Sequence, residues 1–149
     1  MALKKINGTP DNDILIGKSI AELIRGFDGN DKLYGNGGAD RLEGGDGKDI
    51  LDGGNGGDVM LGGLQNDTYY VDQAGDKLTE LKDQGTDTVI SEVDFVLGAN
   101  FEKLQLSGSE MLSGTGNMLN NTLTGNDEAN VLDGLAGADK MVGKDGDDT

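Results

Sequence analysis

A nine-residue period constrains the fold of this chain more than any other feature of its sequence. Glycine begins seven consecutive units, at Gly8, Gly17, Gly26, Gly35, Gly44, Gly53 and Gly62. The sixth position of each unit is acidic: Asp13, Glu22, Asp31, Asp40, Asp49, Asp58 and Asp67. The eighth is large and apolar or aromatic: Leu15, Ile24, Leu33, Leu42, Leu51, Met60 and Tyr69. Self-similarity at a fixed period indicates a repeat architecture, so each unit is expected to be one structural repeat.

A second, shorter array follows after a break. Its units begin at Gly116, Gly125, Gly134 and Gly143, and their sixth positions are Asn121, Asn130, Asp139 and Asp148. The chain ends inside the fourth unit, so we expect it to be an excised part of a longer protein. Between the arrays, residues 71–107 are richer in β-formers and favour several short strands. Residues 76–84 could also form a helix, although they lack capping residues.

Each unit divides into a turn and a very short strand. Six residues such as "GGDGKD" (44–49) are turn material, and three such as "ILD" (50–52) suit a strand. So short a strand needs neighbours about 4.7–4.9 Å away in a parallel sheet. Two units then complete one coil. The predicted fold is an all-β, right-handed parallel β-helix or β-roll solenoid with two repeats per coil and the eighth positions in its core.

This coil stacks like charges. Asp49 is expected above Asp31, and Asp31 above Asp13. Two carboxylates about 5 Å apart repel by roughly 1 kcal/mol in water and by roughly 3 kcal/mol at an effective dielectric constant near 20. Calcium between the turns would turn this repulsion into a net attraction, because the ion binds six to eight oxygens from carboxylates and backbone carbonyls. Magnesium fits these ligands less well. Zinc and copper are disfavoured because the chain has no histidine or cysteine to bind them.

The predicted calcium ligands are the sixth-position side chains and the carbonyls of the turn glycines. The carboxylates are Asp13, Asp31, Asp40, Asp49, Asp58, Asp67, Asp139, Asp148 and Glu22, although Glu22 lies in a poor turn and could equally be solvated. Asn121 and Asn130 are either ligands or members of hydrogen-bonded ladders. The carbonyls are those of Gly26, Gly29, Gly35, Gly37, Gly44, Gly47, Gly53 and Gly56.

Calcium is expected to be a structural component of the fold. About five ions in the first array, each at about ten times its Kd, would contribute roughly 7 kcal/mol. That is comparable with the net stability of an ordinary domain, about 5–15 kcal/mol. We therefore expect the first array to be disordered without calcium.

Composition excludes several other classes of function. The net charge of −16 argues against nucleic acid and anionic membranes as partners. No apolar stretch approaches the length of a membrane span, and the N-terminus lacks a secretory signal. We expect no enzymatic activity, because the repeat accounts for every close pair of carboxylates and there is no histidine or cysteine.

The units at 44–52, "GGDGKDILD", and at 53–61, "GGNGGDVML", resemble the RTX, or haemolysin-type, calcium-binding nonapeptide G-G-x-G-x-D-x-U-x. The resemblance implies a parallel β-roll with calcium ions in its turns. It also implies type I secretion from a Gram-negative bacterium, and thus an extracellular location without an N-terminal signal peptide. The middle segment is similar to connecting segments of large RTX proteins.

On this basis we expect three parts and one leading function. Residues 1–70 form a first calcium-binding array, 71–115 a connecting β segment that continues the solenoid without calcium, and 116–149 a second, partly degenerate array. The leading hypothesis is a module that folds on binding calcium and serves secretion of a larger polypeptide, with the type I secretion machinery as a further partner. The alternative is an extracellular adhesion or matrix spacer, or a ligand-binding platform, stabilised by calcium.

Overall fold

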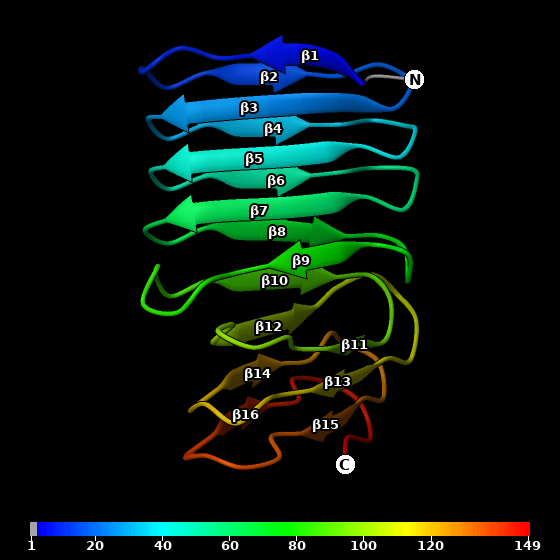
Figure 1. Ribbon diagram of the computed structural model, residues 1–149. Helices are drawn as coiled ribbons and strands as arrows, with labels where there is room; N and C mark the ends of the chain where they lie inside the picture. Colours follow the sequence, from blue (N-terminus) through cyan, green and yellow to red (C-terminus); the bar gives the residue numbers. More distant parts are fainter. Residues whose placement is uncertain (1–2) are drawn as a thin grey trace.

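The chain winds into a parallel β-solenoid whose coils follow one another from the N-terminus to the C-terminus (Figure 1). The computed structural model describes residues 3–149. All strand pairs in this part of the chain are parallel, as the sequence predicts. Among the described residues, no helix long and apolar enough to cross a membrane is found.

The strands form three sheets. A five-stranded sheet contains β1 (Lys4–Asn7), β3 (Glu22–Asp28), β5 (Arg41–Asp46), β7 (Val59–Leu64) and β9 (Lys77–Thr79). An eight-stranded sheet contains β2 (Ile14–Ile16), β4 (Lys32–Tyr34), β6 (Ile50–Asp52), β8 (Thr68–Val71), β10 (Thr88–Ser91), β12 (Lys103–Leu106), β14 (Thr122–Thr124) and β16 (Lys140–Val142). A three-stranded sheet contains β11 (Phe95–Val96), β13 (Ser113–Thr115) and β15 (Val131–Asp133).

The suggested helix at 76–84 is wrong. Strand β9 occupies the start of this segment, and Leu78 pairs with Met60 of β7. The segment lacks capping residues, and its alternation of exposed and half-buried side chains suits the edge of the five-stranded sheet. The parallel ladder therefore determines its conformation.

The register confirms two nine-residue units per coil. Leu33 pairs with Leu51, and Leu51 pairs with Tyr69, so that each residue contacts its equivalent two repeats later. After Tyr69 the coils change length. Thr68 pairs with Thr88, and Thr88 pairs with Lys103. The eight-stranded sheet therefore runs through residues between the arrays although the nine-residue count is lost there.

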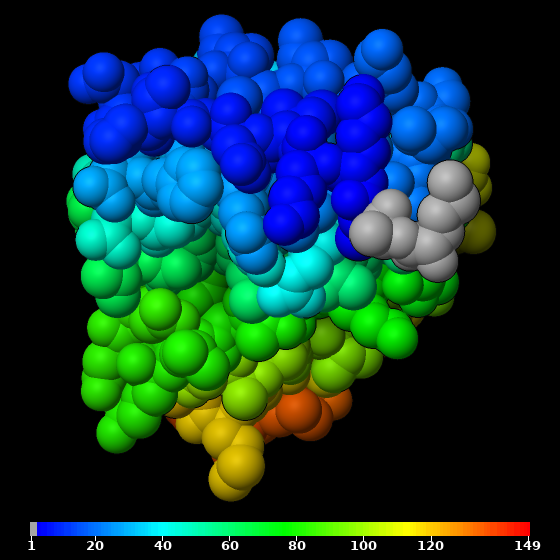
Figure 2. All heavy atoms as spheres, turned by 45° about the horizontal axis from the view of Figure 1, so that its top comes forward, coloured from blue at the N-terminus to red at the C-terminus, as the bar shows by residue number. Residues whose placement is uncertain are grey.

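The core of the first array consists of eighth-position side chains contributed by the five-stranded and the eight-stranded sheets. The following side chains are completely buried: Ile24, Leu33, Leu42, Leu51, Met60 and Tyr69. Leu15 and Leu132 are only partly buried, and Met141 is 52% exposed. Leu15 lies in β2 and Met141 in β16, the two edge strands of their sheet, where no further coil covers them. Figure 2 looks toward the N-terminal end, where the first coil is uncovered.

Residues between the arrays widen the core with larger side chains. Phe101 is buried, and its ring meets the ring of Tyr69 edge-on, with centroids 5.4 Å apart and planes at 76°. Leu104 and Leu106 are also buried. Tyr69 therefore joins the thin core of the first array to the broader core that follows.

Candidate metal centres between the turns

Apart from the half-buried Asp13, the sixth-position acids of the first array are buried and are therefore not solvated turn residues. The exposure of Glu22, Asp31, Asp40, Asp49, Asp58 and Asp67 does not exceed 2%. Buried carboxylates require hydrogen bonds or positive charge to compensate for lost hydration. Each side chain lies at the end of a turn, just before a strand, and the 18-residue register stacks it on its equivalent in the next coil.

One carboxylate oxygen of each sixth-position aspartate from Asp31 to Asp67 joins two coils. The backbone N–H of Asp31 donates to Oδ1 of Asp49 at 2.8 Å, and that of Asp49 donates to Oδ1 of Asp67 at 2.8 Å. On the other edge, the N–H of Glu22 donates to Oδ1 of Asp40 at 2.7 Å. Hydrogen bonds of this kind therefore run along both edges of the roll and satisfy half of each carboxylate.

The other oxygen of these aspartates has no hydrogen-bond partner within residues 3–149. The Oδ2 atoms of Asp31, Asp40, Asp49, Asp58 and Asp67 are buried and accept no hydrogen bond. Leaving one buried acceptor unpaired costs about 1–3 kcal/mol, and more when it is charged. Five such atoms recur at equivalent positions, and a positive group beside them would offset this cost.

Backbone oxygen lies beside three of these atoms, the Oδ2 atoms of Asp31, Asp40 and Asp49. A Cβ built on Gly35 would lie 2.5 Å from Oδ2 of Asp40 and 2.5 Å from the carbonyl oxygen of Gly53 in the next coil. The same arrangement recurs at Gly26 and Gly44. Because the first position carries no side chain, carboxylate and carbonyl oxygens from two coils converge there. Oxygens of these two kinds are the ligands that calcium prefers.

The structure separates the predicted carbonyls into groups. Those of Gly26, Gly35, Gly44 and Gly53 lie next to the first-position glycine of the preceding coil. The carbonyl of Gly29 instead faces the fourth-position Gly47, and Gly56 approaches the carbonyl of Gly38 in the same way. Gly37 lies in a parallel bridge between Ser19 and Asn55.

The second position of the unit divides the turns into two classes. It has a positive φ in every turn that leaves an aspartate Oδ2 buried and unpaired: Phe27, Asn36, Gly45, Gly54 and Gly63. In the other class, the second-position N–H donates to the sixth-position side chain of its own turn. Lys18 donates in this way to Oε2 of Glu22 at 2.6 Å. We call these the open turns and the closed turns.

The first two predicted ligands lie in closed turns. Oδ2 of Asp13 accepts hydrogen bonds from the backbone and hydroxyl of Thr9. Glu22 also forms an ion pair with Lys4, whose Nζ is 3.2 Å from Oε1. Their carboxylates thus find partners within the protein, unlike that of Asp49.

Asn121 and Asn130 also lie in closed turns. Oδ1 of Asn121 accepts the N–H of Asn117 at 2.7 Å, and its Nδ2 donates to the carbonyl of Phe101 at 3.1 Å. Asn130 accepts from the N–H of Asn126 and donates to its side chain, both at 2.8 Å. Both amides thus use their oxygen and their nitrogen in hydrogen bonds within the protein.

Asp139 and Asp148 lie in open turns. Their second-position residues, Leu135 and Lys144, have φ of 62° and 78°. Oδ1 of Asp139 accepts the N–H of Asn121 at 2.8 Å, and Oδ1 of Asp148 accepts that of Asn130 at 2.9 Å. Both carboxylates are half-buried. They share the backbone arrangement of the first array at lower burial.

Burial and stacking change the acidity of these groups. Burial, with a smaller contribution from the charges of Asp31 and Asp46, raises the pKa of Asp49 to about 6. Burial, together with the charges of Asp49, Asp87 and Glu80, raises the pKa of Asp67 to about 8. The backbone hydrogen bond to each carboxylate opposes this rise. The protein by itself thus disfavours the ionised form that a cation would stabilise.

Sequence reasoning missed two acids beside Asp67. Glu80 is 5% exposed and Asp87 is 1% exposed, and with Asp67 they bring carboxylate oxygens within 4.8 Å of one another. Glu80 follows Gly62 by the usual 18 residues, so its position was visible in the period. Asp87 follows Asp67 by 20 residues, which places it outside a nine-residue count.

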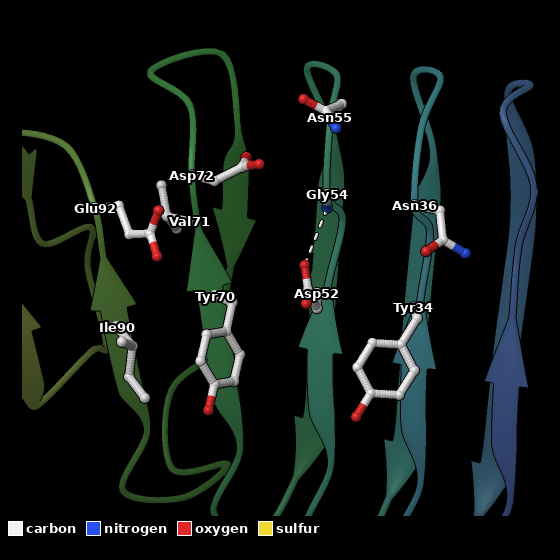
Figure 3. Close-up of a pocket in the computed structure, with 10 residues that line it drawn as sticks. All are labelled: Tyr34, Asn36, Asp52, Gly54, Asn55, Tyr70, Val71, Asp72, Ile90 and Glu92. Atoms are coloured by element: carbon white, nitrogen blue, oxygen red, sulfur yellow. Dashed lines mark hydrogen bonds between the residues drawn. The ribbon is translucent and has the colours of Figure 1, made fainter. Parts of the chain in front are cut away.

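A separate hollow of about 340 Å³ lies on the outer face of the eight-stranded sheet. In Figure 3, the rings of Tyr34 and Tyr70 lie on either side of the strand that carries Asp52. Asp72 and Glu92 also line it, and burial with their charges raises the pKa of Asp52. The hollow thus combines two phenol rings with three carboxylates.

Stacked turns with converging buried oxygens define the chain as a parallel β-roll of repeated, oxygen-rich turns. Comparison with protein families gives the same answer in sequence terms. The profile of the RTX calcium-binding nonapeptide repeat matches four segments, at residues 7–42, 25–60, 34–69 and 115–149. These cover more than half of the chain, which therefore belongs to the RTX calcium-binding repeat family. The same kind of comparison with curated proteins gives no match.

Proposed function

We propose that this chain is a calcium-dependent folding module of a larger exported protein, disordered without calcium and folded when calcium is bound. The observation that carries the proposal is the set of five buried aspartate Oδ2 atoms without a partner. Membership of the RTX family identifies calcium as the cation. We expect about five ions in the first array, one for each open turn with a buried carboxylate.

The mechanism follows from how neighbouring turns share their oxygens. Asp40 and the carbonyl of Gly53 belong to successive coils, so neither coil completes a site alone. Calcium, when bound, supplies the positive charge that these oxygens need. Each coil is also stabilised only by its neighbours, as in other repeat proteins. Folding is therefore expected to be cooperative along the roll and steep in calcium concentration.

The dependence of folding on calcium would serve export of this chain, whose net charge is −16. An acidic, glycine-rich chain with a thin core is expected to stay unfolded at low cytosolic calcium and to pass through a secretion channel. The higher calcium concentration outside the cell then favours the roll. Within this proposal the partners are the rest of a secreted polypeptide and a type I secretion machinery, as the RTX resemblance implies. The proposal assigns the chain no catalytic role.

Far-UV circular dichroism during a calcium titration tests the proposal, with a magnesium titration as the control. We expect a disordered spectrum in excess chelator and a cooperative gain of β signal with calcium alone. Size-exclusion chromatography should show compaction over the same range. A chain that is already folded in chelator, or that folds equally well with magnesium, would contradict the proposal.

The hollow of Figure 3 favours a second candidate function, a calcium-stabilised platform for a ligand or partner. Its carboxylates and tyrosine rings suit a ligand that carries positive charges. Fluorescence anisotropy with a labelled oligolysine peptide would test it on the calcium-loaded protein. The control is the variant Tyr34→Ala/Tyr70→Ala, which keeps the net charge. A tenfold loss of affinity in the variant supports the platform, and equal affinity rejects it.

A further inference from the structure

The roll changes character where the first array meets the residues that follow it. In the regular turns, the first-position glycine of one coil lies beside the carbonyl of a first-position glycine in the next. Beside Gly62, the hydroxyl of Tyr69 takes the place of this carbonyl. A Cβ built there would meet Oδ2 of Asp67 and the hydroxyl of Tyr69. The register of β7 and β9 pairs Leu61 with Thr79, so the residue opposite Gly62 is Glu80.

The ladder of carboxylates nevertheless continues across this junction. The N–H of Asp67 donates to Oδ1 of Asp87 at 2.8 Å, as the N–H of Asp49 donates to Asp67. The N–H of Asp87 donates in turn to Oε2 of Glu102 at 2.9 Å. The longer coil therefore places an acid, Asp87, at the stacked position, and an oxygen of Glu80 lies within 4.8 Å of oxygens of Asp67 and Asp87.

Three carboxylates thus converge in the interior of the protein. Their oxygens lie within 4.8 Å of one another, and no residue of the three is more than 5% exposed. Oδ2 of Asp67 and Oε2 of Glu80 are both buried without a hydrogen-bond partner. The ion pairs found in the described chain involve none of the three acids. Two unpaired oxygens from different coils are therefore directed into one uncompensated site.

Tyr69 holds the side chain of Glu80 in position. Its hydroxyl donates to Oε1 of Glu80 and accepts the N–H of Gly62. The Tyr69 ring is held in the core against Phe101. Because Oε1 is held by the phenol, Oε2 of Glu80 remains free to face Asp67. Tyr69 is thus a positioning residue for this cluster.

We propose that the last of the five sites expected in the first array is formed by three carboxylates, those of Asp67, Glu80 and Asp87, and closes the array at its C-terminal end. It differs from the repeat sites because a glutamate carboxylate replaces a glycine carbonyl. More ligand charge raises affinity for a hard cation, so this site is expected to bind calcium more tightly than the regular turns. The inference requires that the family's calcium binding operates here, but it does not require the chain to unfold without calcium.

Terbium luminescence excited through tyrosine tests the site, because terbium replaces calcium among oxygen ligands and is sensitised only by nearby tyrosines. The test protein is Tyr34→Phe/Tyr70→Phe, which keeps every carboxylate and leaves Tyr69 as the sensitiser. Glu80→Gln is then introduced, with Glu110→Gln as the control that removes an exposed charge elsewhere. Bound calcium is counted in parallel by elemental analysis after dialysis.

We expect Glu80→Gln to lose one bound calcium ion and to weaken the tightest terbium binding at least tenfold, while Glu110→Gln matches the parent. Asp87→Asn should reproduce the loss, and it provides the readout if Glu80→Gln does not fold. Unchanged ion counts and luminescence in the folded variants would overturn the site. So would higher stability of Glu80→Gln in saturating calcium, because a protonated cluster would then explain the geometry. If these results occur while the parent still folds on calcium binding, only this inference fails.

Discussion

The backbone N–H of Asp31 donates a 2.8 Å hydrogen bond to Oδ1 of Asp49, the equivalent residue one coil later. The second oxygen of Asp49 is buried and has no partner. A single side chain thus joins two coils through one oxygen and offers the other to a cation. Repetition of this relationship links the stacking of the coils to the binding of positive charge.

Asp49→Asn should weaken calcium-dependent folding. The amide can still accept the N–H of Asp31, but it loses the negative charge at the candidate site. We expect the calcium concentration at the folding midpoint to rise about tenfold, equivalent to about 1.4 kcal/mol. Circular dichroism during calcium titration provides the measurement. Asp127→Asn, at an exposed position, is the control and should leave the midpoint unchanged. Equal midpoints in the two variants would show that Asp49 is not a ligand.

Two adjacent glycines should differ sharply in their tolerance of a methyl group. Gly38 has a φ of +115°, and a Cβ there would lie 2.5 Å from the carbonyl carbon of Ile20. A Cβ on Gly37 would have its nearest neighbours at 3.7 Å. Gly38→Ala should therefore cost more than about 1 kcal/mol in the free energy of unfolding, whereas Gly37→Ala should cost less. Urea denaturation in saturating calcium measures both. Similar losses would mean that the turn backbone adapts freely.

Leu51→Ala should strongly destabilise the calcium-loaded roll. Leu51 is completely buried in the core, and truncation of its side chain should cost about 2–5 kcal/mol. Met141 is the matched control, because it is an eighth-position residue that is 52% exposed at the edge of its sheet. Met141→Ala should cost less than about 1 kcal/mol. Thermal unfolding with excess calcium distinguishes the two, and equal shifts in Tm would contradict this description of the core.

Acidification should partly replace calcium. Burial is the main cause that raises the pKa of Asp49 to about 6 and that of Asp67 to about 8, from the ordinary aspartate value of 3.8. Their protonation therefore stabilises the folded state fully below pH of about 4, and this contribution is lost as pH rises through these two values. In buffer stripped of divalent cations, β signal should increase as pH falls from about 8 to about 4.5. Circular dichroism measures the β signal. A loss of that signal as pH falls over this range would refute the prediction.

Some of the site was readable from sequence, and the exceptions have physical causes. The period identified Asp31, Asp40 and Asp49 because the same side chain must recur wherever equivalent turns stack. It could not separate these residues from Glu22, which has the same position in its unit. The difference is that the N–H of Lys18 turns inward and satisfies the glutamate carboxylate.

The amino-acid sequence by itself determined the coil, because glycine, acid and apolar residue in a nine-residue register leave few ways to bury the apolar side chain. Tertiary structure alone decided which carboxylates remain unpaired. Phe27 and Asn36 adopt positive φ although neither is glycine, so composition does not determine the class of their turns. The 20-residue spacing that brings Asp87 beside Asp67 was likewise hidden. Such contacts depend on how neighbouring coils fit together, which no single repeat encodes.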